Sequence, residues 1–251
     1  MKKRRLIVEI SVVAILLFFW QYNPLPEYVL PRPASVVKEI VQTAPLIWRH
    51  TMVTLYESLM GYLLSFVFGI AIAALMYLVP NVGRSLLPVL VFTQTIPVVV
   101  IAPIIVIWFG FGVSTKIGTV AFLCFFPITI NAYDGFRTVD PDSLDLFKAY
   151  KASWYQRMKF LLLPHALPYI FSGMKVAITY AITAAVVAEW MGAEMGLGIY
   201  LIRALNSFKV ERVFAGILVI IAFTLGFFYV LDRFSRRIAP WAARSEGGVQ
   251  I

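Results

Sequence analysis

The amino-acid sequence predicts an all-α integral membrane protein with about six transmembrane helices. Of its 251 residues, 61% are hydrophobic and only 14% are charged, and its mean hydropathy is +0.83. A soluble domain of this length would lack enough polar surface to cover itself. Several apolar segments also approach the ~20 residues that a helix needs to cross the hydrocarbon core of a bilayer. Together these observations exclude an ordinary soluble globular fold.

The first span is expected from about Leu6 to Tyr22, directly after four basic residues. This is the charged start of a signal peptide, but the segment Trp20–Pro24 lacks the small residues of a cleavage site. We therefore expect residues 1–22 to form a basic cytoplasmic start and an uncleaved membrane anchor.

An amphipathic helix is expected on the membrane surface within residues 23–50. Leu30–Pro33 breaks the chain, and Ser35 is expected to cap a helix that continues to about Ile47. This helix is too short and too polar to span the membrane. Its apolar side is formed by Val36, Val37, Ile40 and Val41.

The second and third spans differ in how many prolines they contain. The second runs from about Thr54 to Val79, where Pro80–Gly83 signals a turn. The third runs from about Leu86 to Trp108 and is expected to bend or break, because proline removes a helical hydrogen bond. Its prolines are Pro88, Pro97 and Pro103.

The last three spans complete a core region, residues 51–235, followed by a tail at 236–251. The fourth span is short, from about Ile117 to Ala132, and contains Pro127. The fifth runs from about Met174 to Met191, and the sixth, Val213–Leu231, carries no charge.

The charges assign a side to each loop. Lys and Arg number 15 on the side that holds both termini and residues 136–175, and 7 on the other, which together make the 22 of the chain. Cytoplasmic loops carry the excess of Lys and Arg. We therefore expect both termini and the long loop 136–175 to lie in the cytoplasm.

The long loop contains residues at a fixed spacing. Asp145 is followed directly by Leu146 and Phe147, Lys151 comes after three further residues, Leu161 after nine more, and Leu163-Pro164 one residue later. This spacing resembles the docking loop of permease subunits of binding-protein-dependent ABC importers, which reads Glu-Ala-Ala, three residues, Gly, nine residues, Ile, one residue, Leu-Pro. Asp145 stands at the Glu position, Leu146 and Phe147 replace the two alanines, and Lys151 replaces the glycine.

Further segments extend the resemblance along nearly the whole chain, toward the branch that imports sulfonates, nitrate, taurine and thiamine-pyrimidine precursors. Three of them, Cys124–Pro127, Asp134–Arg137 and Ala177–Tyr180, are most similar to permeases proposed for hydroxymethylpyrimidine. The others are Leu30–Val36, Gln94–Pro97, Ala102-Pro103, Trp108–Gly112, Ala188–Gly192 and Gly196–Gly198.

The resemblance implies a type I importer permease fold and a set of partners. These are a dimer of ATP-binding subunits, which hold the ATP and Mg²⁺, an extracytoplasmic solute-binding protein and a second permease copy. The expected location is a bacterial inner or plasma membrane. The solute is expected to be small and polar, such as hydroxymethylpyrimidine, with an aliphatic sulfonate, taurine or nitrate as alternatives.

The physical pattern of the loop agrees with ATPase docking. A short helix opened by Asp142 or Ser143 would present Leu146, Phe147, Tyr150 and Trp154 as one apolar stripe, away from Lys148, Lys151 and Arg157. An amphipathic helix lying on lipid is the alternative interpretation. The residues expected to couple to the ATPase are Asp145, Leu146, Phe147, Tyr150, Lys151, Ala152, Trp154, Leu161 and Pro164.

Polar residues inside the spans are candidates for the solute pathway, because their burial in hydrocarbon is costly. Gln94 and Thr95 precede the break at Pro97, where exposed backbone can contact a solute. Thr183 and Glu189 are also expected at the pathway, and Glu57 and Asn131 share the property. Hydrogen bonding between neighbouring helices is an equal alternative for any one of them. Glu57 and Glu189 lie near span ends, where snorkelling or pairing with a nearby base is the favoured alternative.

Other functions are less well supported by the sequence. Gly110–Lys116 lacks the glycine that precedes lysine in a phosphate loop. No cofactor or metal is expected in this chain, because Cys124 has no cysteine partner and His50 and His165 fall on opposite sides of the membrane. An ion-coupled carrier that uses Glu57 and Glu189, and an embedded enzyme that uses His165, remain as alternatives.

Overall fold

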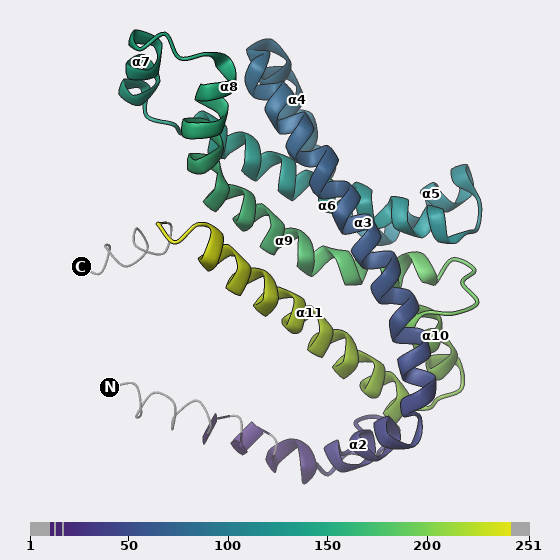
Figure 1. Cartoon of the computed structure of the whole chain (residues 1–251). Helices are drawn as coiled ribbons and strands as arrows, with labels where there is room; N and C mark the ends of the chain where they lie inside the picture. Colours follow the sequence, from purple (N-terminus) through teal and green to yellow (C-terminus); the bar gives the residue numbers. More distant parts are fainter. Residues whose placement is uncertain (1–10, 13, 17, 242–251) are drawn as a thin grey trace.

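The computed structural model describes residues 11–12, 14–16 and 18–241, and these form helices and turns without a strand (Figure 1). Four helices are long and apolar enough to cross a membrane, and one bent pair of helices would make a fifth span. The all-α membrane fold is therefore confirmed. The first predicted span, Leu6 to Tyr22, lies partly outside the described residues.

The long helices extend beyond the predicted spans at both ends or at one. α3 begins before Thr54 and ends one residue before Val79. The apolar pattern marks only the part of a helix that lies in hydrocarbon, whereas hydrogen bonding continues into the polar interface. The long helices are α3 (Ala44–Leu78), α6 (Val113–Arg137), α9 (Leu163–Glu189) and α11 (Val210–Ile238).

The third predicted span is broken in the structure, as expected. α4 (Pro80–Gln94) and α5 (Val98–Phe109) meet at an angle of 103°. Pro97 lies in the break with an extended backbone and has no N–H to continue the helix. Pro88 and Pro103 lie inside α4 and α5 instead.

The core is built around α6, which packs along both α3 and α9. Small residues allow these backbones to approach closely. A Cβ on Gly61 of α3 would lie 2.7 Å from the carbonyl oxygen of Ile117, and one on Gly173 of α9 would lie 2.6 Å from that of Pro127. A side chain at either glycine would therefore push two helices apart.

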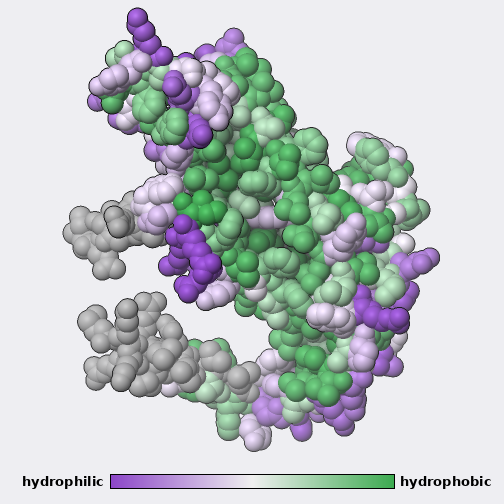
Figure 2. All heavy atoms as spheres, viewed as in Figure 1, coloured by the Kyte–Doolittle hydropathy of each residue, from purple (hydrophilic) through white to green (hydrophobic). Residues whose placement is uncertain are grey.

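Apart from α4 and α5, the short helices lie toward the two ends of the long ones (Figure 1). Figure 2 shows hydrophobic residues over the middle of the visible face and hydrophilic residues toward both ends, as a protein that crosses a bilayer requires. One end carries α2 (Pro33–Gln42) and α10 (Leu197–Asn206), and the other carries α7 (Pro141–Ala149), α8 (Trp154–Arg157) and a single π-helical turn, η1 (Met158–Leu162).

The expected surface helix is present as α2, but its predicted bounds and cap are wrong. It begins at Pro33, has no side-chain cap and ends at Gln42. Proline has a fixed φ that suits the first helical position, so Ser35 is already inside the helix. Of the four residues predicted to share its apolar side, Val36 is buried, whereas Val37 and Val41 are exposed.

Candidate functional site

The loop between α6 and α9 folds as one separate short helix, α7, followed by α8, which continues without a break through η1 into α9. Asp140 caps α7 by accepting a hydrogen bond from the N–H of Ser143 at 3.2 Å. The predicted cap at Asp142 or Ser143 is therefore wrong, because Pro141 already occupies the first helical position. Ser153 caps α8 through reciprocal hydrogen bonds with Gln156.

Lys151 separates the two helices. Its φ of 49° places it in the left-handed region, which glycine adopts most readily. This is the position at which the docking-loop motif has glycine, so the sharp turn is kept although the residue differs. α7 ends at Ala149 and α8 begins at Trp154, so the predicted apolar stripe is divided and Trp154 lies on a second helix.

Between the two helices lies an open hollow of about 490 Å³. Tyr150 is 80% exposed and Leu146 is 55% exposed, which are high values for apolar side chains that no other part of the described chain covers. The lining residues are Leu146, Phe147, Tyr150, Ala152, Gln156 and Phe160.

The remaining predicted coupling residues lie around this hollow or behind it. Asp145 is exposed and pairs with Lys148 at 2.8 Å. Leu161 lies in η1 and packs against the core, and Pro164 lies in the first turn of α9. The hollow is therefore connected through η1 to the start of the long helix α9.

The predicted pathway residues near the break are on the surface of the single chain. Gln94, Thr95 and Pro97 are exposed, and the hydroxyl of Thr95 donates to the carbonyl oxygen of Phe92 at 2.7 Å. Thr183 is also exposed, on α9. The side chains of these four residues can therefore contact another molecule.

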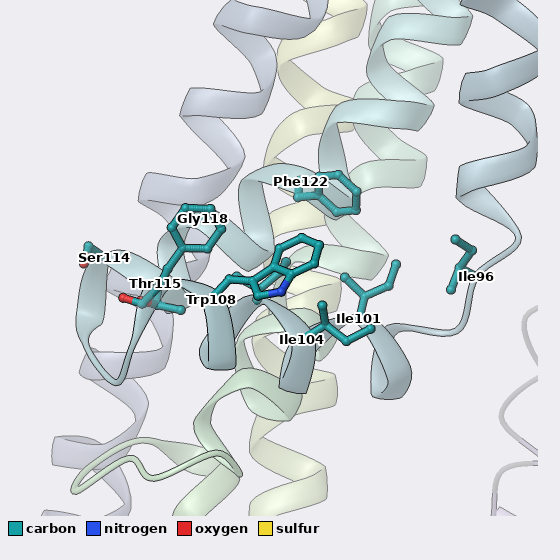
Figure 3. A pocket seen from close by; sticks show the side chains of 10 residues that line it. Ile96, Ile101, Ile104, Trp108, Ser114, Thr115, Gly118 and Phe122 are labelled. Atoms are coloured by element: carbon teal, nitrogen blue, oxygen red, sulfur yellow. The ribbon is translucent and has the colours of Figure 1, made fainter.

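A cavity of about 690 Å³ lies beside the break, between α5 and the first turns of α6 (Figure 3). Its wall is mainly aliphatic and aromatic. Ile96 contributes to it, but its neighbours Thr95 and Pro97 do not. The lining residues are Ile96, Ile101, Ile104, Ile105, Trp108, Phe109, Ser114, Thr115, Gly118 and Phe122.

Glu57 is completely buried and forms an ion pair with Lys116, whose Nζ lies 3.2 Å from Oε1. Pairing of Glu57 with a nearby base is expected from the sequence, but Lys116 is not singled out there as that base, because it counts only as an outer-side charge. The usable signal was that a glutamate inside one span and a lysine at the start of another both require compensation in hydrocarbon. The pair joins α3 to α6.

Glu189 is also completely buried, and both of its oxygens are engaged. Oε1 accepts from the hydroxyl of Thr54 at 2.6 Å, and Oε2 accepts from the N–H of Gly198. The N–H of Leu197 donates to Thr54 at 2.7 Å, and that of Gly196 to His50 Nδ1 at 3.0 Å.

These bonds satisfy the first N–H groups of α10, which have no partners within the helix. We call His50, Thr54 and Glu189 the α10 clamp. It brings α3, α9 and α10 together, with His50 accepting a backbone hydrogen bond at the start of α10. Thr54 was missed because an isolated threonine in an apolar span has no distinctive pattern.

The described residues contain no group of three His, Cys, Asp or Glu side chains that could hold a metal ion. Cys124 is buried. His165 lies 3.2 Å from the hydroxyl of Thr138 and stacks on Tyr169.

Comparisons with known proteins agree with the architecture. The family described as "Binding-protein-dependent transport system inner membrane component" matches residues 65–240. A probable ABC transporter permease protein of Haemophilus influenzae is 37% identical over 234 residues, covering 92% of this chain and 96% of that protein. The formylaminopyrimidine transport permease ThiX of Halalkalibacterium halodurans is 34% identical, covering 85% and 86%.

The fold is also similar to a solved structure. The inward-facing MetNI methionine ABC transporter gives a TM-score of 0.69 at 17% identity, and the match covers 78% of this chain and 98% of that chain. At this identity the similarity concerns the fold alone.

Proposed function

Since this chain belongs to the family of binding-protein-dependent transport system inner membrane components, the permease subunits of ABC importers, we propose that it imports a small pyrimidine of the hydroxymethylpyrimidine type. It is a transport subunit, and ATP is hydrolysed by a separate ATPase subunit. A solute-binding protein is the other general partner of such importers.

The hollow between α7 and α8 is the observation that supports coupling to the ATPase. It exposes Tyr150 and Leu146, which belong to the segment that keeps the spacing of the docking-loop motif. We propose that a dimer of ATP-binding subunits, with ATP and Mg²⁺, receives these apolar side chains in a groove on its surface. Movement of α7 and α8 would then be transmitted through η1 and Pro164 into α9.

The substrate proposal is supported by the relatives' names. ThiX transports formylaminopyrimidine by its name and is 34% identical, whereas the aliphatic sulfonate permease SsuC of Bacillus subtilis is 30% identical and the taurine permease TauC of Escherichia coli is 29% identical. A sulfonate, taurine or nitrate is the alternative substrate.

We propose that the pathway forms between two copies of the chain. Gln94, Thr95, Pro97 and Thr183 are exposed in one copy, and a second copy would enclose them. Glu189 would have to release two hydrogen bonds to reach a solute, so it contributes to the pathway through the position of α10.

We propose that the chain lies in a bacterial cell membrane with both termini and the α7–α8 end in the cytoplasm. The excess of Lys and Arg on that side supports this orientation. The end with α2 and α10 would then face the solute-binding protein.

Transport into vesicles tests the proposal. The chain is reconstituted with its ATPase and solute-binding protein, and uptake of hydroxymethylpyrimidine and taurine is compared with ATP on the ATPase side or with an imposed proton gradient. We expect ATP-dependent uptake of the pyrimidine. An ATPase variant that binds but does not hydrolyse ATP is the control.

Two other results would have distinct meanings. ATP-dependent uptake of taurine alone would mean that taurine, not the pyrimidine, is the substrate, and would leave the ATP-driven mechanism unchanged. Uptake driven by the gradient without ATP would contradict the importer mechanism and favour an ion-coupled carrier that uses Glu57 and Glu189.

A further inference from the structure

Two glutamates from different helices meet inside the molecule, beside the start of α10. Glu57 of α3 and Glu189 of α9 are both completely buried, and their carboxyl groups lie within hydrogen-bonding reach of each other. They are the only fully buried acids among the described residues. Two ionised carboxylates this close repel each other strongly where no water screens them.

The positive charge beside this pair is too small to balance two carboxylates. Lys116 of α6 lies 3.2 Å from Glu57 Oε1, and within the described chain it is the one cation that acts on both carboxyl groups. His50 of α3 contacts the backbone before α10 instead, and Arg203 of α10 donates to another backbone oxygen. If both glutamates were ionised, one uncompensated negative charge would remain buried, which is costly inside a membrane.

The hydrogen bonds around the pair leave one oxygen atom without a donor. Both oxygens of Glu189 accept hydrogen bonds, from the hydroxyl of Thr54 and from the N–H of Gly198. Glu57 Oε1 accepts from Lys116, whereas Glu57 Oε2 is buried and has no hydrogen-bond partner in the described part of the chain. A buried carboxylate oxygen without a donor costs free energy, but a protonated carboxyl group supplies a donor of its own.

We propose that Glu57 and Glu189 together form a binding site for one proton. The proton lies on Glu57 Oε2, and this O–H donates to the carboxylate of Glu189. One carboxylate and the ammonium group of Lys116 then remain, so the buried charges balance. The same proton gives Glu57 Oε2 the hydrogen bond that it otherwise lacks. This site does not depend on the proposed substrate or on the ATPase.

The shared proton connects the ion pair between α3 and α6 to the α10 clamp. Lys116 bonds to Glu57, Glu57 to Glu189, and Glu189 to the N–H of Gly198 in the first turn of α10. When the proton leaves, the two carboxylates repel each other, and Glu189 can no longer keep its position beside both Glu57 and Gly198. The attachment of α10 to α3 and α9 therefore weakens at alkaline pH.

Infrared spectroscopy detects the proton directly. The full-length chain is purified in a detergent without carbonyl groups, and the carbonyl stretch of protonated carboxyl groups is recorded at neutral pH. We expect such a band in the unchanged chain and its loss in Glu57→Gln and in Glu189→Gln. Either variant leaves one glutamate, whose negative charge Lys116 balances without a proton. Because the two variants alter different helices, one of them tests the site if the other unfolds.

Glu39→Gln is the matched control, because Glu39 is a half-buried glutamate that pairs with a cation of its own, Arg212, at 2.6 Å. The band should be unchanged in this variant. A water molecule on Glu57 Oε2 is the competing explanation, and it leaves both glutamates ionised. No band in the unchanged chain, or the same band in both Glu57→Gln and Glu189→Gln, would therefore overturn the proposal.

Thermal unfolding as a function of pH tests the effect of the proton on the fold. Glutamates of the unfolded chain are ionised well above about pH 4, so the folded chain holds one proton more and its stability falls as the pH rises. Between about pH 6 and 9, the unfolding temperature should fall more steeply in the unchanged chain and in Glu39→Gln than in Glu57→Gln, whose amide donates the same hydrogen bond but cannot ionise. Equal slopes in all three proteins would contradict the proposal.

Discussion

Lys151 shows how one residue sets the shape of the docking loop. Its φ of 49° costs a non-glycine residue roughly 1 kcal/mol. Lys151→Gly should therefore stabilise the turn, whereas Lys151→Val, which is β-branched, should open it. The measurement is hydrogen exchange at the N–H of Ala152, which donates to the carbonyl oxygen of Phe147 at 2.9 Å. Faster exchange in the glycine variant than in the valine variant would contradict this explanation.

The pair of Glu57 and Lys116 leads to a second residue-scale prediction. Because both side chains are buried, Lys116→Met should leave a buried carboxylate without its partner and destabilise the chain by about 3–5 kcal/mol. Glu57→Leu combined with Lys116→Met should recover most of that loss. Unfolding in detergent measures Glu57→Leu, Lys116→Met and the double variant in a double-mutant cycle. A loss in the double variant equal to the sum of the two single losses would show that the pair is not energetically coupled.

At the scale of elements, the α10 clamp predicts that one hydroxyl holds a helix in place. Thr54→Val should leave the N–H of Leu197 unpaired, at a cost of about 1–3 kcal/mol, and should accelerate hydrogen exchange at the start of α10. Thr93→Val is the control, because the hydroxyl of Thr93 only contacts its own helix at 2.8 Å and is exposed. Slow exchange at Leu197 in Thr54→Val would mean that water replaces the hydroxyl.

The α7–α8 hollow predicts where the ATPase binds. Tyr150→Asp should weaken ATPase binding by at least about tenfold, since buried aromatic anchors often contribute ~2 kcal/mol or more to an interface. Phe208→Asp is the matched control, because Phe208 is 86% exposed and Tyr150 is 80% exposed, on opposite ends. Co-purification from membranes measures binding. A loss in the Phe208 variant, or none in the Tyr150 variant, would locate the interface elsewhere.

Elements with a repetitive pattern could be predicted from the sequence, and those made by single contacts could not. The long apolar segments that became α6, α9 and α11, and the break at Pro97, follow from hydropathy and from proline chemistry. α10 was not predicted, because its start depends on side chains from α3 and α9 that are distant in sequence. The docking residues could be predicted from the spacing of the motif. Their division between α7 and α8 could not, because it depends on the left-handed backbone of Lys151.

At the scale of the whole molecule, the distribution of charge predicts which end faces the cytoplasm. In a Cys124→Ala background, Ser153→Cys between α7 and α8 and Asn206→Cys at the end of α10 place exposed thiols at opposite ends. Because 15 of the 22 Lys and Arg residues follow the α7–α8 side in the predicted topology, we expect the thiol at 153 to be cytoplasmic. A membrane-impermeant maleimide applied to intact cells should label the thiol at 206, and should reach that at 153 only after the membrane is opened. The reverse pattern would place the α7–α8 hollow outside the cell, where no ATP-hydrolysing partner could reach it, and would contradict both the orientation and the docking role.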